Sequence, residues 1–452
     1  MRPTGFGGVL LRETDAEYDE AREVFNAMVD RKPALIAQCE TAADVQAAVR
    51  YGVANELELA VRGGGHAVTG DGVSDGGMVI DLRRMYSVQI DPGRRLARVG
   101  GGATWSDLDG AGQQYGLVTT GGRVSSIGVA GLALGGGSGW LERKLGLASD
   151  ALVSVELVTA DGELVIADET KNTELFWALH GGGGNFGVAT ALTFRLTRVA
   201  TTTLAVLVWP AAAGASVLRM YRDLIEADAP EELGGGVVFL TAPAFGFVPE
   251  PLVAQPVVLA IAVYAGPADE ARDMFAPMFA LSPEGAFLAE LPYAELQSAL
   301  DSPAGFRNYC SAEHLSALPD PAVRAFCDRA GEILVPSPSQ QAMLPWGGAV
   351  RRGSGDWPQA YRDAAWVARP FGAWTHPCSD ARVIRWARDV CEDLEPWSTG
   401  HVCPNFVGHE GRDRMIAAFG AANYDRLARV KCRYDPENVF HLNQNVEPQW
   451  RC

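Results

Sequence analysis

The sequence predicts an α+β protein, and the pattern of its residues changes once along the chain. Three glycine-rich runs lie among strand-like segments within the first 200 residues. After about residue 200, glycine thins out and alternating strands are separated by helical segments. The later texture is typical of an antiparallel sheet with helices on one face. With 452 residues, 48% of them hydrophobic and 21% charged, the chain can bury the cores of two or three domains.

The first 82 residues alternate between helical and strand-like periodicity. Apolar side chains at Tyr18, Ala21, Val24, Phe25 and Met28 share one face of a helix. A β-α-β-loop-β unit follows, so the first glycine run lies where a strand passes into a loop. In chain order we expect a helix over 15–30, a strand over 33–37, a helix over 45–51 capped by Thr41 or Asp44, and strands over 57–61 and 76–82.

The first glycine run reads Arg62-Gly-Gly-Gly-His66. Three residues without a Cβ let the backbone turn sharply and bring its N–H groups against a ligand. Phosphate oxygens are the usual ligand of such groups. The His66 imidazole can reach the same ligand. Taken alone, the motif fits a tight turn followed by a satisfied histidine equally well.

Two more glycine-rich regions follow within the first 200 residues. Residues 121–146 interleave glycine with apolar residues, which argues against a disordered linker. The region is then either close backbone packing or, as we favour, a backbone-lined cradle for an extended ligand. Residues 180–188 form the third run. Around these runs we expect a strand over 96–99, a helix from Thr104 to about 115, a hairpin over 153–167 turning at Asp161-Gly162, and a strand over 189–196.

The part after residue 200 is expected to form the antiparallel sheet with helices on one face. Its clearest strand patterns are residues 204–208, 237–240 and 257–263. Near the end of the chain, an amphipathic helix starts at Asn423 and stops at Tyr434-Asp435-Pro436. A strand or turn rich in asparagine follows, over residues 438–446.

The composition restricts partners and location. A net charge of −17 and a sequence pI of about 4.9 argue against nucleic acid and anionic membranes as partners. No stretch reaches the roughly 20 apolar residues of a membrane-spanning helix, and the N-terminus has no apolar segment of signal-peptide length. The eight cysteines form no CxxC pair, so we expect no metal site and reduced thiols in a cytoplasmic protein.

The glycine runs need a nucleotide-binding fold other than the common ones, since neither a Rossmann GxGxxG fingerprint nor a GxxxxGK(S/T) P-loop occurs. The sequence closely resembles the FAD-linked oxidases of the berberine-bridge-enzyme-like family. That family belongs to the vanillyl-alcohol-oxidase and p-cresol-methylhydroxylase (PCMH) superfamily. The resemblance is carried, in family order, by residues 62–66, 128–139, 180–188 and 423–446, and spans nearly the whole chain.

The resemblance implies a bilobed PCMH-type FAD-binding fold. It implies an FAD lobe over 1–200, a substrate lobe over 201–404 and a C-terminal segment over 405–452 that returns to the FAD lobe. FAD would be the cofactor, carried covalently by His66 through the C8 methyl of the ring, which anchors the flavin and makes it a stronger oxidant. The other residues implied at the cofactor are Arg62, Gly63, Gly64, Gly65, Ala67, Gly70, Gly122, Ser125, Ser126, Gly128, Gly131, Gly135, Gly139, Gly187, Val188, Asn443 and Asn445.

The chain departs from the family at the second flavin attachment. Many members attach the flavin again through a cysteine shortly before the Gly-Val-x-Gly motif, and here the matching position is Val124. No cysteine lies between Cys39 and Cys310. We therefore expect FAD to be attached singly, through His66, which should leave the substrate face of the ring more open or the flavin less oxidising.

Two further departures affect the catalytic base. The tyrosine that many members place over the ring is replaced by Cys403, and His401 has the better pKa for proton abstraction near neutral pH. In an extended segment the two share a face. A lysine of some relatives is replaced by Ser311, which leaves Tyr309 and Glu313 as candidates for contacting substrate, with a structural surface role as the alternative. The candidate catalytic residues are thus Cys403, His401, Tyr309 and Glu313.

The resemblance implies a flavin-dependent oxidase, or alternatively a cyclase. The oxidase would take a hydride from a C–H bond of a small organic substrate, such as a secondary metabolite, and O2 would reoxidise the flavin to give H2O2. The alternative flavoprotein would cyclise or rearrange a biosynthetic intermediate with no net oxidation, which Cys403 in place of tyrosine keeps open. A non-enzymatic flavin scaffold would have little reason to keep His66 and intact glycine runs. The expected partners are a small-molecule substrate and O2, with no nucleic acid and no membrane, in a monomer or homodimer.

Overall fold

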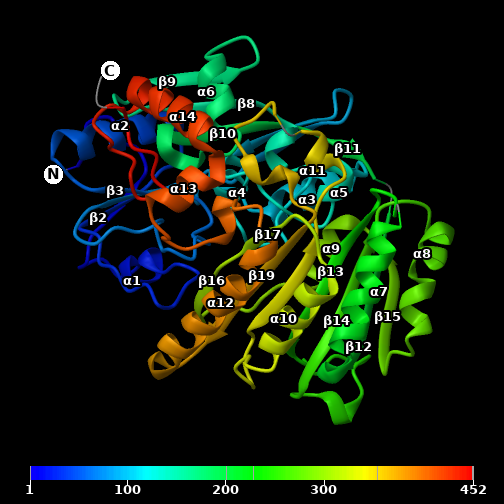
Figure 1. Cartoon of the computed structure of the whole chain (residues 1–452). Helices are drawn as coiled ribbons and strands as arrows, with labels where there is room; N and C mark the ends of the chain where they lie inside the picture. Colours follow the sequence, from blue (N-terminus) through cyan, green and yellow to red (C-terminus); the bar gives the residue numbers. More distant parts are fainter. Residues whose placement is uncertain (1, 200, 228, 354, 450–452) are drawn as a thin grey trace.

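The structure is a computed structural model that describes residues 2–199, 201–227, 229–353 and 355–449. Elements from the first 200 residues and from the C-terminal segment lie together, at the upper left of Figure 1. The elements between them form a second group beside the first (Figure 1). Mixed helices and mainly antiparallel sheets make up both groups, so the predicted α+β class is confirmed.

A four-stranded sheet opens the chain, in the order β1-β2-β4-β3, and holds the first glycine run at its edge. Its strands β2, β4 and β3 are parallel. Thr41 starts the connecting helix: its Oγ1 accepts from the Asp44 N–H at 3.2 Å while Asp44 Oδ2 accepts from the Thr41 N–H at 2.9 Å. The elements are β1 (Val9–Leu11), β2 (Leu35–Gln38), α2 (Ala42–Ala54), β3 (Leu59–Arg62) and β4 (Met78–Asp81).

A five-stranded antiparallel sheet follows, in the order β5-β6-β10-β8-β9. The predicted hairpin is β8 and β9, paired from Ser154↔Asp168 to Val158↔Leu164. Thr104 caps α3 in a capping box with Asp107. The elements are β5 (Val88–Asp91), β6 (Leu96–Gly100), α3 (Trp105–Gln113), β7 (Leu117–Val118), α4 (Val129–Leu134), α5 (Glu142–Leu145), β8 (Leu152–Val158), β9 (Leu164–Asp168), α6 (Thr173–Ala178), β10 (Val188–Arg195) and β11 (Thr197–Arg198).

The helix predicted over residues 15–30 is wrong beyond its first turn and a half. Only α1 (Tyr18–Arg22) is helical. Beyond it the backbone bonds to distant segments: the Phe25 N–H donates to Gly65 O at 3.0 Å and the Ala27 N–H to Phe306 O at 2.9 Å. The Asn26 side chain also bridges Val68 O and Asn308 O. These long-range bonds replace the helical ladder, and no local periodicity reveals them.

The second group is built on an eight-stranded sheet in which all described pairs are antiparallel, in the order β15-β12-β14-β13-β18-β19-β16 with β17 paired to β19. Helices α7, α8, α10 and α12 cover one face, where Val237 and Phe239 of β13 are buried among them (Figure 1). Val238 and Leu240 face the opposite side, toward the first group. The elements are β12 (Thr202–Pro210), α7 (Gly214–Glu226), β13 (Leu233–Thr241), β14 (Pro256–Tyr264), α8 (Ala268–Ala280), β15 (Gly285–Leu291), α9 (Tyr293–Ser298), β16 (Arg307–Cys310), β17 (Glu313–Leu315), α10 (Asp320–Ala330), β18 (Gln340–Pro345), α11 (Ala349–Arg352), β19 (Trp366–Trp374) and α12 (Asp380–Leu394).

The chain then returns to the first group through α13 (Arg412–Phe419) and α14 (Ala421–Tyr434). Lys431 of α14 is fully buried, and its Nζ donates to Asp435 Oδ2 at 2.6 Å, Asn185 O at 2.7 Å and Phe440 O at 2.9 Å. All three protons of the ammonium are thus bonded. This cluster ties α14 to the third glycine run and to the asparagine-rich segment.

The structure bears on the expected state of the cysteines and on the expected absence of a membrane-spanning helix. Cys432 of α14 is disulfide-bonded, so the expectation of reduced thiols is wrong at this position; spacing along the chain does not show which cysteines meet in the fold. Cys39, Cys310, Cys327, Cys378, Cys391 and Cys403 are free. Within the described residues, no helix is long and apolar enough to cross a membrane.

Replacing Lys431 with Met should destabilise the protein strongly. The Asp435 carboxylate, which is also fully buried, would lose its cation, and breaking a buried pair in this way costs about 3–5 kcal/mol. Urea unfolding measures the loss. Arg429→Met, an exposed position of the same helix, is the matched control and should stay within about 0.5 kcal/mol of the parent. A loss below about 1 kcal/mol at Lys431 would contradict the prediction.

Candidate functional site

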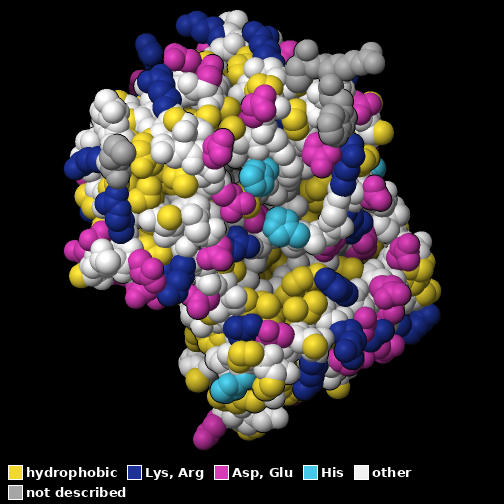
Figure 2. All heavy atoms as spheres, turned by 90° about the vertical axis from the view of Figure 1, so that its left-hand side faces the viewer, with side chains coloured by type: hydrophobic (Ala, Val, Ile, Leu, Met, Phe, Trp, Pro, Cys, Tyr) yellow, Lys and Arg dark blue, Asp and Glu magenta, His cyan; other side chains and the backbone are white. Residues whose placement is uncertain are grey.

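A cavity of about 870 Å³ lies between the glycine runs of the first group and the open face of the eight-stranded sheet. The glycine-rich loops line one side and β13, β14, β18 and β19 line the other. Figure 2 shows a hollow between the two parts of the molecule, with hydrophobic side chains along its lower side. One wall therefore offers backbone groups and the other offers apolar side chains.

The first two glycine runs touch each other at Gly64 and Gly128. A Cβ on Gly64 would lie 2.3 Å from Gly128 N, and a Cβ on Gly128 would lie 2.4 Å from Gly64 N. Neither contact is possible for a real side chain, so this approach requires glycine at both positions. Gly65 has a φ of +70°, in the left-handed region that glycine enters without strain. Both runs then line the cavity with bare backbone.

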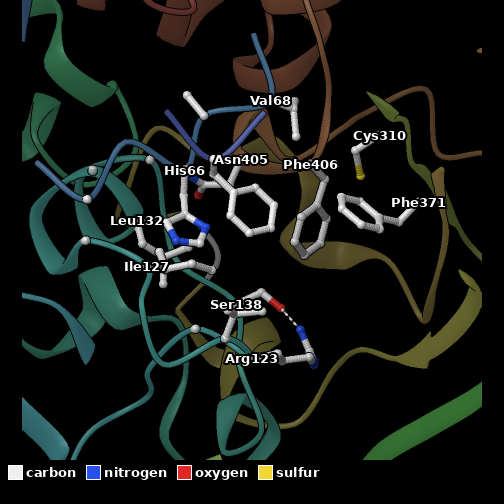
Figure 3. Close-up of a pocket in the computed structure, with 18 of the residues that line it drawn as sticks. His66, Val68, Arg123, Ile127, Leu132, Ser138, Cys310, Phe371, Asn405 and Phe406 are labelled. Atoms are coloured by element: carbon white, nitrogen blue, oxygen red, sulfur yellow. Dashed lines mark hydrogen bonds between the residues drawn. The ribbon is translucent and has the colours of Figure 1, made fainter. Parts of the chain in front are cut away.

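His66 projects into this cavity from the end of the first run (Figure 3). Its Nε2 lies 3.0 Å from Ser126 Oγ, and its ring stacks on Phe25 with the centroids 4.3 Å apart. Burial lowers the pKa of His66 to about 4, although the Asp301 carboxylate opposes this. The imidazole is therefore neutral, and nucleophilic, at neutral pH.

The third glycine run and the asparagine-rich segment meet at the wall of the cavity. The Asn185 side chain donates to Gly182 O at 2.7 Å and accepts from the Val446 N–H at 2.8 Å. Asn443 lines the cavity, and its Nδ2 donates to Phe440 O at 3.0 Å. Among the described residues, its buried Oδ1 has no hydrogen-bond partner, and the same holds for Oδ1 of Asn445. Buried acceptors of this kind call for a donor from a bound molecule.

The structure brings most of the predicted cofactor residues together around this cavity. Ser126 and Ser125 lie just behind the lining: Ser126 contacts His66, and the Ser125 N–H donates to the Asp301 carboxylate at 2.7 Å. The lining includes Gly63, Gly64, Gly65, His66, Ala67, Gly122, Gly128, Gly131, Gly135, Gly187 and Asn443, and, among the described residues, it does not include Arg62, Gly70, Ser125, Ser126, Gly139, Val188 or Asn445.

The residues outside the lining support it from behind. The Arg62 guanidinium is buried and donates to the carbonyl of Ala21. Gly139 packs so closely on Gly121 that a Cβ would lie 1.6 Å from its carbonyl oxygen. Val188 starts β10 and is fully buried in the core. These positions hold the shape of the glycine loops.

The predicted catalytic residues lie outside the cavity. In the described part of the chain, the lining includes none of Cys403, His401, Tyr309 and Glu313. Cys403 is fully buried, 3.9 Å from Asn405 Oδ1, and burial raises its pKa to about 11. The Tyr309 hydroxyl accepts from Arg388 Nε at 3.1 Å, and Glu313 is buried in an ion pair with Arg414 at 3.0 Å. His401 is half-buried.

Several lining residues were not predicted from the sequence. Asn405 and Phe406 follow Cys403 and reach the cavity, and the Gly137 N–H donates to Asn405 Oδ1 at 3.2 Å. Figure 3 shows Phe406 between His66 on one side and Cys310 and Phe371 on the other. Side chains alternate along β16 and β19, and this alternation would predict Cys310 and Phe371 as lining residues if the register of the sheet were known.

A histidine–carboxylate contact lies at the edge of the cavity. Asp71 lines the cavity, and its Oδ1 lies 2.9 Å from His409 Nε2, while its Oδ2 accepts from Thr69 Oγ1 at 2.5 Å. The hydrogen bond to Asp71 raises the pKa of His409, although burial and Arg31 oppose this. The contact joins the loop after the first glycine run to the segment after Phe406.

The donor set of this cavity fits FAD. Backbone N–H groups of the glycine loops suit a pyrophosphate, and the unpartnered Asn443 Oδ1 suits a hydroxyl or ring N–H. Residues 33–168 match the family described as FAD binding domain, and residues 403–447 match the family described as Berberine and berberine like. The fold and the cavity thus define an FAD-binding oxidoreductase.

Comparisons with individual proteins narrow this class. The chain is 28% identical to the FAD-linked oxidoreductase YgaK of Bacillus subtilis, over 99% of this chain and 98% of that protein. It is 40% identical to (R)-6-hydroxynicotine oxidase of Paenarthrobacter nicotinovorans over 194 residues, 43% of this chain and 42% of that one. The crystal structure of 6-hydroxy-D-nicotine oxidase from Arthrobacter nicotinovorans superimposes with a TM-score of 0.86 at 28% identity, covering 98% of each chain. By these matches the chain is similar to the berberine-bridge-enzyme-like FAD-linked oxidases of the PCMH type.

Replacing Gly64 with Ala should abolish FAD binding, because the new Cβ would push the first two glycine runs apart. The flavin content of the purified protein, read by absorbance, measures the effect. Gly110→Ala is the matched control: this glycine is exposed in α3 with open space around it, so the helix should gain about 0.5–1 kcal/mol and keep its flavin. Full flavin content in Gly64→Ala would contradict the close approach.

His409 should titrate above its ordinary value of about 6.5 in the native protein. Because the folded pKa is raised, the contact with Asp71 contributes stability below about pH 6.5 that is lost as the pH rises through the folded pKa. An NMR titration of the His409 ring protons measures this pKa. Asp71→Asn should lower it toward the ordinary value, and an unchanged pKa in that variant would contradict the assignment.

Proposed function

We propose that the protein is a flavin-dependent oxidase that holds FAD through a single covalent bond to His66. The observation that carries this proposal is the neutral, half-buried imidazole of His66 inside the glycine-lined cavity. Val124, which lines the same cavity at the position where many relatives have cysteine, supports the single link. Bound FAD would supply the hydride acceptor and, with O2, the route to H2O2.

The chain's own residues would bind and orient the reactants. The backbone of residues 63–65 and Gly128 would hold the pyrophosphate, and Asn443 Oδ1 would accept a hydrogen bond from the cofactor. Ser126 fixes the orientation of the His66 ring. The apolar wall of β13, β14 and β18 would exclude water from the substrate.

Two of the four predicted catalytic residues, Cys403 and Glu313, would act indirectly. Cys403 lies beside Asn405, which reaches the cavity, so we propose that it positions this amide rather than accepting a proton itself. Its raised pKa supports this, because a thiol with a pKa of about 11 stays protonated at neutral pH. Glu313, paired with Arg414, would anchor the C-terminal segment. Tyr309 and His401 stay predictions, which substitution and measurement of the flavin reduction rate can test.

The apolar wall favours a hydrophobic substrate. Side chains of Val238, Leu240, Leu259 and Ile261 are among those that the strands offer to the cavity. A polyhydroxylated sugar would need many hydrogen-bond partners there, whereas an aromatic or alicyclic molecule would not. We therefore propose a compact, largely apolar organic molecule as substrate.

Acid precipitation tests the covalent link. The wild-type pellet should be yellow, with flavin mass on the peptide that contains His66, and His66→Ala should give a colourless pellet while still binding FAD through the glycine loops. His376→Ala, at an exposed position of the second group, is the matched control and should behave as wild type. A colourless wild-type pellet would overturn the covalent proposal.

Anaerobic mixing with apolar candidate substrates tests the oxidase reaction. A true substrate should bleach the flavin band at about 450 nm. Admission of O2 should then restore the band and yield H2O2. Turnover without bleaching and without O2 consumption would instead support the cyclase or rearrangement reaction.

A further inference from the structure

Arg369 stands out in the apolar wall of the cavity. It lies on β19 opposite Ala342 of β18, and both residues line the cavity. Its guanidinium carbon lies 5.1 Å from the ring centroid of Phe406 and 5.6 Å from that of Phe371. Two aromatic faces therefore hold a cation against the substrate side of the cavity.

The other charged side chains of the lining are already compensated. Arg123 pairs with Glu142 at 2.6 Å, Asp71 contacts His409 at 2.9 Å, and Asp301 accepts from Ser125 N at 2.7 Å. These residues have partners from the protein itself. Each of these side chains is thus bonded within the protein.

Arg369 has no such compensation. Among the described residues, no carboxylate lies within ion-pair distance of its guanidinium, and its Nε is buried without a hydrogen-bond partner. The thiol of Cys310 interacts with this guanidinium, and burial raises the pKa of that thiol, so the thiol carries no negative charge. A half-buried cation without a counter-charge is costly unless a ligand supplies one.

We propose that Arg369 binds a carboxylate of the substrate, so that the enzyme acts on aromatic or alicyclic acids rather than on neutral or cationic molecules. The planar guanidinium presents a rigid fork of N–H donors that matches a carboxylate, and such charge-assisted pairs are about twice as strong as neutral hydrogen bonds. Phe371 and Phe406 hold the plane of this fork. The apolar wall beside it receives the body of the same molecule. This inference rests on the proposed oxidase function, because it identifies the substrate of that site.

Ligand binding to the FAD-loaded protein tests the proposal without knowledge of the true substrate. The probes are benzoate and cinnamate, with benzamide and cinnamamide as neutral counterparts of the same shape. Isothermal titration calorimetry gives their affinities, and the change in the flavin spectrum shows whether they bind beside the cofactor. The wild type should bind each acid at least about tenfold more tightly than its amide.

Three variants separate charge, geometry and fold. Arg369→Met should lose that preference, with the affinity for the acids falling at least about tenfold and the affinity for the amides unchanged. Arg369→Lys keeps the charge without the fork and should lie between Met and wild type. Arg382→Met, on the exposed side of α12 across the sheet, is the matched control and should keep the wild-type preference.

Each contrary result overturns the proposal. Equal affinity of the wild type for acids and amides would show that the protein has no carboxylate site. An Arg369→Met variant that still prefers acids over amides would show that Arg369 does not form such a site. Loss of FAD from Arg369→Met would show that the guanidinium binds the cofactor and not the substrate. If Arg369→Met fails to fold, an Arg369→Lys variant with unchanged affinity for every probe has the same meaning. The proposed oxidase function fails separately, when the wild type carries no flavin or no substrate bleaches it, because calorimetry needs no turnover.

Discussion

The buried ion pair between Lys431 and Asp435 is the contact on which the cofactor half of the cavity depends. The ammonium bonds to Asn185 O of the third glycine run and to Phe440 O of the asparagine-rich segment. Asp435 in turn accepts from the N–H groups of Val439 and Phe440, at 2.7 and 2.8 Å. Two irregular segments that are far apart in the sequence are thereby fixed to one helix end. Asn443 reaches the cavity only because this segment is held in place.

The two walls of the cavity suit different ligands, because one wall is built from glycine loops and the other from a sheet. Loops without side chains expose N–H groups, which suits an anionic cofactor that must be approached closely. A sheet presents every second side chain, so one face can be a continuous apolar surface while the other packs on helices. Val237 and Val238 are adjacent in sequence yet serve the helix-covered core and the cavity wall, respectively. The substrate and the cofactor thus meet at the boundary between two kinds of structure.

Local signals in the sequence were enough to predict much of this arrangement. The capping residues Thr41 and Thr104, the hairpin at Asp161 and the position of His66 in the glycine loops all depend on neighbours within a few residues. The helix over residues 15–30 failed because its backbone bonds go to Gly65 and Phe306, which no local pattern shows. Asn185, which joins the third run to Val446 across 261 positions, was missed for the same reason.

On the substrate side of the cavity, a sequence motif predicts the right strand but not which of its side chains face the substrate, because the register of the sheet is unknown. Tyr309 and Cys310 are neighbours on β16, and they pair with Gly372 and Phe371 of β19. Because side chains alternate, Tyr309 faces α12, where Arg388 bonds to it, while Cys310 and Phe371 face the cavity. A prediction of Cys310 in place of Tyr309 would therefore have named a lining residue. On β19, the next side chain after Phe371 that faces the cavity is that of Arg369. Periodicity therefore selects the set of facing residues, but the pairing of distant strands decides which set meets the substrate.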